Sequence, residues 1–228
     1  MGRAGLAWSQ SDIPRAKELA YEAVLVAQAA GALWEEGQAQ VVLGVAANTE
    51  LDWKAARRHL ERSIEICEEL GVEPDTEKLN LGVIALDSGD YVTAATLFED
   101  VLAFRRRTGA VEGMGFALLN LGLVRRELGD NEASRRDFDE ARMCFGQIGF
   151  RAHMAHALQG IAAAEASEGR FEGAARLLGR ARAELDEVGW SEDDFAPELP
   201  VEIEEQVRAA IGDEGFEAAY SAGRDGAD

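Results

Sequence analysis

The sequence predicts an all-α fold, a solenoid in which pairs of helices stack side by side, and two observations lead to it. The stretch Leu-Asn-Leu-Gly at residues 79–82 returns forty residues later, at 119–122. Of the 228 residues, 47% are hydrophobic but only 7% are aromatic, and only four are proline. Abundant Ala, Leu, Glu and Arg favour helix because these side chains lose little freedom in one. A fixed period near forty residues with helical patterning is typical of stacked repeats.

The predicted turns keep a nearly constant register along the chain. The residues just after them lie 40, 38, 40 and 40 positions apart: Ile13, Trp53, Tyr91, Asn131 and Phe171. Glycines and capping residues at these turns set the expected helix ends. The predicted helices span residues 14–30, 32–49, 53–70, 76–88, 91–107, 111–128, 131–146, 152–168 and 171–188, and residues 4–10 are expected to end a further helix. We therefore expect five repeats within residues 1–188, at about 1–31, 32–72, 73–109, 110–149 and 150–188.

The register also predicts how each pair packs. A small residue in the first helix lets the second helix approach closely, and a larger apolar residue in the second helix fills the space beside it. The predicted small–large pairs are Gly44 with Leu60, Gly82 with Phe98, Gly122 with Phe138, and Ala162 with Leu178.

This pattern, LG-x6-GD(Y/N)-x2-(A/S)-x3-F, resembles the tetratricopeptide repeat, lengthened from its usual 34 residues to about forty by longer helices. The resemblance covers the chain to about Val188. It implies a right-handed superhelix whose inner surface is lined by the first helix of each pair. The chain departs from the family in lacking the proline that usually ends each pair.

Residues 189–228 break the period. We expect an acidic linker and then two helices, Val201–Ile211 and Glu214–Ser221, which cap the end of the solenoid. The side chains expected to face the core are Val201, Ile203, Val207 and Ile211.

The residues from Ala174 to Gly179, this linker and the stretch from Ile211 to Arg224 are similar to the C-terminal repeat region of large ATP-dependent bacterial transcriptional regulators, the LuxR-type and related signal-transduction ATPases. The sequence has no G-x4-GK(S/T) phosphate loop and no room for a helix-turn-helix after Arg224. We also expect the chain to begin partway through its first repeat. One interpretation is therefore that the chain is an excised part of such a regulator.

Charge and cysteine content narrow the function classes. The formal net charge is −20, from 43 acidic and 23 basic residues, and this charge repels nucleic acids and anionic membranes. The two cysteines, Cys67 and Cys144, form neither a disulfide framework nor a zinc motif, and no apolar stretch is long enough for a signal peptide or a membrane span. We therefore expect a cytoplasmic protein.

No catalytic or metal site emerges from the sequence. The acidic pairs lack a nucleophile or base beside them, so we expect no enzyme and no cofactor. His153 and His156 have a spacing that could place two imidazoles on one metal, but no further ligand lies near them in the sequence. Surface or packing histidines are the favoured interpretation.

Asn80 and Asn120 are the leading candidates for a binding site. An asparagine inside a helix is unfavourable, because its amide competes for backbone hydrogen bonds. In peptide-binding members of the tetratricopeptide family an asparagine at this place holds the main chain of a bound peptide, and the resemblance implies that role here. A hydrogen bond between adjacent repeats is the alternative. The other residues expected along the same groove are Val83, Phe116, Leu123, Arg126, Asn48 and Gln159.

These observations predict a protein-interaction or regulatory sensor module that binds a peptide or a helix in its inner groove. Two alternatives stay open. The groove could hold a small-molecule effector, or the array could mediate self-association through its first repeat, giving a homodimer.

Overall fold

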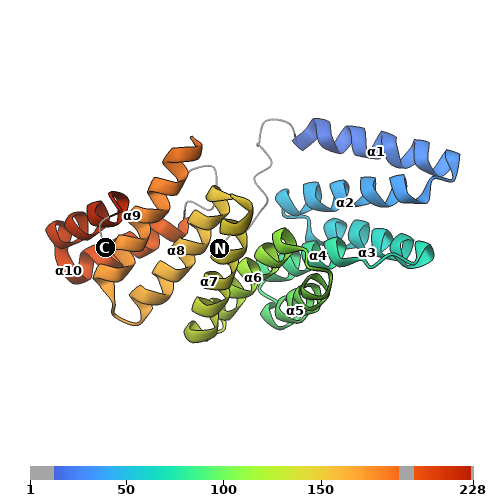
Figure 1. Ribbon diagram of the computed structural model, residues 1–228. Coiled ribbons are helices and arrows are strands. Elements are labelled where there is room, and N and C mark those ends of the chain that lie inside the picture. Colours follow the sequence, from blue (N-terminus) through green and yellow to red (C-terminus); the bar gives the residue numbers. More distant parts are fainter. Residues whose placement is uncertain (1–12, 190–197, 227–228) are drawn as a thin grey trace. The chain divides into compact units, whose positions relative to one another are not determined.

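The computed structural model describes residues 13–189 and 198–226, and these residues form helices and no strand (Figure 1). The predicted all-α class is confirmed. The predicted helix end at residues 4–10 lies outside the described residues. The helices are α1 (Ile13–Ala30), α2 (Leu33–Thr49), α3 (Trp53–Leu70), α4 (Asp75–Asp87), α5 (Tyr91–Thr108), α6 (Val111–Glu127), α7 (Asn131–Ile148), α8 (Arg151–Ser167), α9 (Phe171–Val188) and α10 (Glu198–Arg224).

The chain divides into two compact units, and the division falls between Val101 and Leu102, inside α5. In the first unit α1 packs on α2, and α2 packs on α3. In the second unit α6 packs on α7, α7 on α8, α8 on α9, and α9 on α10. Each helix from α1 to α9 begins and ends within two residues of the predicted position.

The turns inside the helix pairs use one backbone conformation. Gly89, Gly129 and Gly169 all have φ near +80°, which the absence of a side chain permits. The corresponding turn between α2 and α3 has Leu51 instead, with φ of 62° and a side chain that is 55% exposed. Leu51 therefore holds a left-handed conformation that costs a residue with a Cβ about 1 to 2 kcal/mol.

Close packing inside the pairs follows the predicted small–large register. A Cβ added at Gly44 would lie 2.8 Å from Leu60, and one added at Gly122 would lie 2.7 Å from Phe138. The equivalent contact from Gly82 to Phe98 is 2.5 Å. These spaces are too small for any side chain, so the three glycines let the helices approach.

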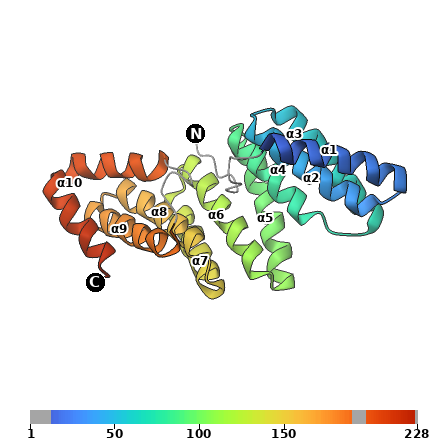
Figure 2. The same ribbon diagram turned by 90° about the horizontal axis from the view of Figure 1, so that it is seen from above.

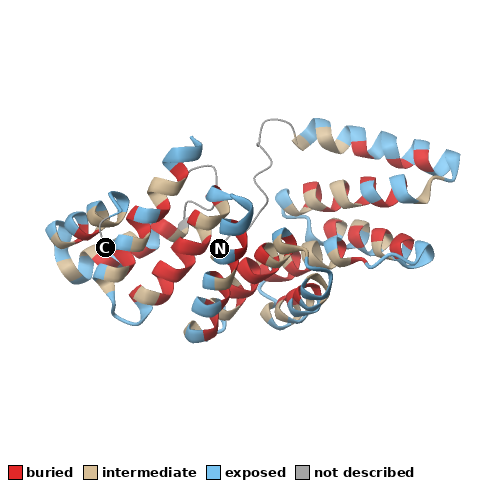
Figure 3. Ribbon diagram, in the orientation of Figure 1, coloured by how far each residue is buried: buried red, intermediate tan, exposed pale blue. Residues whose placement is uncertain are grey.

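The first and second helices of the pairs differ in burial (Figure 3). In α8, 11 of 17 residues are buried, whereas in α9 only 6 of 18 are. First helices therefore pack on more than one side, and second helices keep a wide face in solvent.

Residues 198–224, labelled α10, form two helical arms, as predicted. The backbone at Gly212 between them is not helical (φ 74°, ψ 167°), and Figure 2 shows the two arms on either side of this bend. The arms extend beyond the predicted outer ends, to Glu198 and Arg224. Ile203 and Val207 are 3% and 0% exposed, as predicted. The prediction for Val201 is wrong, because this side chain is 54% exposed. Ile203 and Val207 are four residues apart and share one helix face, whereas Val201 points about 200° away from Ile203.

The first arm of α10 packs on α8 and the second arm on α9. Ile203 and Val207 lie in one apolar cluster with Ala162 and Ala166, and the Gln206 amide donates to the Ala166 carbonyl at 3.3 Å. None of the described helices is long and apolar enough to cross a membrane.

Candidate functional site

All eight predicted groove residues lie on first helices. Within the unit that ends at Val101, α2 carries one of them and α4 two: Asn48, Asn80 and Val83. In the second unit, α6 carries four and α8 one: Phe116, Asn120, Leu123, Arg126 and Gln159.

The two leading asparagines make the same local hydrogen bond. The Asn80 amide donates to the Thr76 carbonyl at 2.9 Å, and the Asn120 amide donates to the Phe116 carbonyl at 2.9 Å. Each bond reaches back one turn in its own helix, so one amide hydrogen of each residue is already used.

The two asparagines differ in burial. Asn80 is half-buried, so solvent reaches part of its side chain. Asn120 is only 6% exposed, and its Oδ1 is shielded and accepts no hydrogen bond from the described residues. A buried amide oxygen without a donor costs about 1 to 3 kcal/mol. Of the two asparagines, Asn80 therefore has the more accessible side chain.

Asn48 joins neighbouring first helices. Its amide donates to the Asp87 carboxylate of α4 at 2.9 Å, and its own Oδ1 is shielded from solvent. One turn earlier on each helix lie Val45 and Val83, both half-buried. The hydrogen bond therefore fixes α2 to α4 beside two partly exposed apolar side chains.

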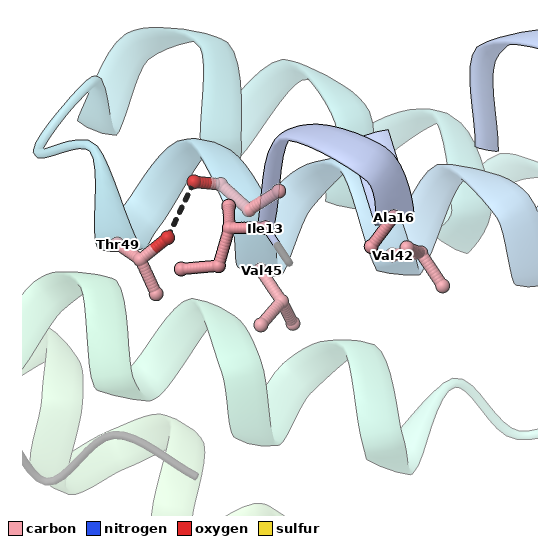
Figure 4. A pocket seen from close by; sticks show the side chains of 6 residues that line it. Ile13, Ala16, Val42, Val45 and Thr49 are labelled. Atoms are coloured by element: carbon pink, nitrogen blue, oxygen red, sulfur yellow. Dashed lines mark hydrogen bonds between the residues drawn. The ribbon is translucent and has the colours of Figure 1, made fainter. Parts of the chain in front are cut away.

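A small apolar recess lies between α1 and α2 (Figure 4). Its volume is about 10 Å³, enough for one water molecule. It is lined by Ile13, Ala16, Val42, Val45, Ala46 and Thr49. Val42 stands where the next two first helices have Asn80 and Asn120, so the apolar character of this position in α2 was visible in the sequence. The recess itself could not be predicted from the sequence, because it depends on how α1 packs against α2.

In the second unit Phe116 belongs to an aromatic cluster. Its ring meets Phe145 edge-on at 5.2 Å and His153 edge-on at 4.9 Å, and Phe150 lies 5.6 Å from His153 on another side. Burial lowers the pKa of His153. These contacts bear out the packing interpretation of His153, and the described residues contain no cluster that could hold a metal ion.

The pKa of His156 lies well below its usual value of 6.5, because burial disfavours the charged ring and the neighbouring His153 adds to the effect. Burial therefore favours the neutral form of the His156 ring.

The remaining candidates in this unit are less accessible than the sequence suggests. Gln159 is only 4% exposed. Arg126 is paired with Glu202 of α10 at 3.1 Å, so its charge is already balanced. Leu123 is half-buried. At the position equivalent to Asn120 in α8, Gly160 lies against Phe138, with 2.6 Å from an added Cβ to the ring. The ring fills the space that an asparagine would need.

Neither the scan against protein-family models nor the search of curated proteins finds a match for this sequence. A solved structure does match: BtubC (BKLC) from P. vanneervenii superposes with a TM-score of 0.71 over 96% of this chain and 90% of that chain. The helical fold is shared. The sequence identity is only 16%, so the likeness to BtubC concerns the fold alone.

Proposed function

We propose that this chain is a protein-interaction module of the helical-solenoid type and that it binds a peptide or a helix on the surface formed by α2 and α4. The observation that carries the proposal is the combination on this surface of half-buried apolar side chains, Val42, Val45 and Val83, with the accessible amide of Asn80. Apolar side chains supply affinity through burial, and an amide with both donor and acceptor can hold a main chain without reading its sequence.

The surface is held in place before any ligand arrives. The Asn48–Asp87 hydrogen bond joins α2 to α4, and Gly44 and Gly82 lock each helix against its partner. A preformed surface loses little conformational freedom on binding, so more of the contact energy appears as affinity.

A peptide or helix fits this surface better than a small molecule. The recess beside Val42 has a volume of about 10 Å³, whereas small-molecule sites typically enclose about 300 to 1,000 Å³. A single methyl group of a bound chain could enter the mouth of this recess, but an effector could not be enclosed there. The surface therefore favours a ligand that lies across it.

The test is selection of binding peptides from a phage-displayed library against the intact chain. We expect selected peptides to lose at least tenfold in affinity against Val83→Glu and several-fold against the milder Asn80→Ala. The control is Val92→Glu, because Val92 lies on α5, outside α2 and α4, and is 72% exposed. Peptides that bind all three variants as tightly as the wild type would refute the proposed site.

The variant Asn120→Ala distinguishes the two interpretations of this buried asparagine, which are peptide binding and a structural hydrogen bond. The substitution removes a shielded oxygen without a donor and adds a better helix former, so we expect stability to rise by roughly 1 kcal/mol. Such a gain would mean that the asparagine is retained at a cost in stability. A loss of stability of similar size would assign Asn120 to the structural role that the sequence left open.

The cellular compartment of the chain and its place in a larger regulator are also proposals. The two cysteines are unpaired and buried, which suits a reducing compartment, and we place the protein in the cytoplasm. The sequence resemblance to LuxR-type regulators favours a module that passes a binding event to a larger regulator. The sequence of the complete gene and of its neighbours tests this setting.

A further inference from the structure

The first arm of α10 lies on a position of α8 that belongs to the predicted inner groove in the preceding repeats. The residue of α8 equivalent to the groove residues Val83 and Leu123 is Ala163. Val83 and Leu123 are half-buried. Ala163 is only 8% exposed, and it lies in one apolar cluster with Ile203 and Val207 of the arm. The arm therefore covers the groove face of α8.

The arm also reaches past α8 to α6. Arg126 of α6 pairs with Glu202 of the arm at 3.1 Å. The residue equivalent to Arg126 in α2 is Asn48, and it bonds to Asp87 of the very next first helix. Arg126 instead contacts a segment that follows the next helix pair. The arm thus lies across two first helices, and Figure 2 shows its N-terminal end on the side of α6.

The contacts of the arm are those of an amphipathic helix in a groove. Its two buried anchors, Ile203 and Val207, are four positions apart and share one helix face. The side chains of α8 in the same cluster are all small: Ala162, Ala163 and Ala166. These alanines leave the room that the two branched side chains fill. Apolar anchors one turn apart are the pattern by which such grooves recognise helices.

The first arm is held less tightly than the second. Its ion pair joins side chains that are 32% and 61% exposed, Arg126 and Glu202, and pairs in water contribute little. The Gln206 amide donates to a backbone carbonyl of α8 at 3.3 Å, which is long for a hydrogen bond. In the second arm the backbones themselves meet, since a Cβ at Gly223 would lie 2.0 Å from the Arg176 carbonyl oxygen.

The two arms meet at Gly212, where the backbone is not helical. Arg208, one turn before this bend, pairs with Asp213 at 3.1 Å and with Glu217 at 2.5 Å. These contacts tie the C-terminal end of the first arm to the second arm. The N-terminal end, which carries Glu202 and Ile203, is therefore the part that can leave the groove while the second arm stays docked.

We propose that the inner surface of α6 and α8 is a binding site for a partner helix, and that the first arm of α10 is its built-in competitor. The arm itself defines the chemistry of the partner. It is an amphipathic helix with two branched apolar residues four positions apart and a carboxylate just before the first of them, which pairs with Arg126. This site lies in the second unit, so it does not depend on the proposed α2–α4 surface.

Competition within one chain sets the expected affinities. A tethered segment acts at an effective concentration of about millimolar, so it outcompetes a dilute free helix with the same contacts. The apparent affinity of the partner falls in proportion to the fraction of chains whose groove is open. Weakening the arm should therefore strengthen the binding of a helix supplied from outside.

The first test measures binding of a fluorescein-labelled peptide with the sequence of residues 198–211 to the full chain by fluorescence anisotropy. We expect the peptide to bind the Ile203→Asp chain about tenfold or more tighter than the wild type, because the buried charge releases the arm. The control Val201→Asp adds the same charge to the same arm, at a side chain that is 54% exposed, and should bind as the wild type does. Circular dichroism checks that both chains are folded. Equal binding to all three chains overturns the proposal.

The second test examines the ion pair in the released chain. Adding Arg126→Glu to Ile203→Asp should weaken binding of this peptide several-fold, and a peptide with Glu202→Arg should restore it. A loss that the reversed peptide does not restore overturns the assignment of Arg126 to the partner's carboxylate.

The third test needs no substitution. In the wild-type chain, amide hydrogens of residues 203–207 should exchange at least about tenfold faster than those of residues 216–220, because the first arm opens alone. Equal exchange in the two arms would mean that α10 opens only as a whole, and this result overturns the proposal even if Ile203→Asp fails to fold.

Discussion

Replacing Gly122 with Ala should destabilise the fold, although alanine is the better helix former. The ring of Phe138 is only 1% exposed and lies between two first helices, 2.7 Å from a Cβ at Gly122 and 2.6 Å from one at Gly160. To restore an ordinary contact the ring has to retreat from α6 by about 0.7 Å, and α8 blocks the way. Overpacking of a filled core costs about 1 to 3 kcal/mol, and the helix propensity of alanine returns up to about 1 kcal/mol. The expected net loss is about 1 to 2 kcal/mol.

Urea unfolding followed by circular dichroism measures this loss, and a matched substitution provides the control. Gly146 lies on the exposed side of α7, and the nearest atom to an added Cβ is Met154 Sδ at 3.7 Å. Gly146→Ala should therefore gain about 0.5 to 1 kcal/mol from helix propensity alone. Adding Phe138→Leu to Gly122→Ala should recover part of the loss, because the smaller side chain frees space. If Gly122→Ala proves as stable as Gly146→Ala, the close-packing explanation of the repeat is wrong.

Three further predictions concern single residues. Leu51→Gly should raise the free energy of unfolding by about 0.5 to 1 kcal/mol, because glycine takes the positive φ of this turn without strain; a loss in urea unfolding would contradict this. Gly179→Ala should undock the second arm of α10 and speed its hydrogen exchange, since the new Cβ would lie 2.0 Å from the Tyr220 carbonyl oxygen; unchanged exchange would show that this close contact is not needed. Because the pKa of His156 is lowered in the folded chain, only the unfolded chain gains this proton below pH 6.5, so stability should fall by about 1 kcal/mol from pH 7.5 to 5.5 and less in His156→Leu.

The repeat made the helices predictable. Glycine turns and capping aspartates mark the ends of the elements locally, so helix bounds could be read to within two residues from α1 to α9. The contacts of Gly44, Gly82 and Gly122 could also be predicted, because small and large residues recur at fixed offsets within each pair. The positive φ of Leu51 could not be predicted from its residue type, because the flanking helices set the conformation of this turn and the leucine side chain does not favour it.

The accessibility of the candidate site could not be predicted in the same way. Asn80 and Asn120 stand in the same sequence context, yet one is half-buried and the other only 6% exposed. Burial of a first helix depends on the neighbouring pair, and Phe138, which lies against Gly160, belongs to a different repeat from that glycine. Val201 was misplaced for a similar reason, because the period that orients the other helices ends before α10.

Amide hydrogen exchange of the chain, with and without a selected peptide, tests the central claim that the α2–α4 surface binds a partner. Binding should slow exchange in α2 and α4, with the clearest change around Val45 and Val83, and leave the exposed face of α7 unaffected. Slower exchange confined to second helices, with α2 and α4 unchanged, would contradict the proposed function.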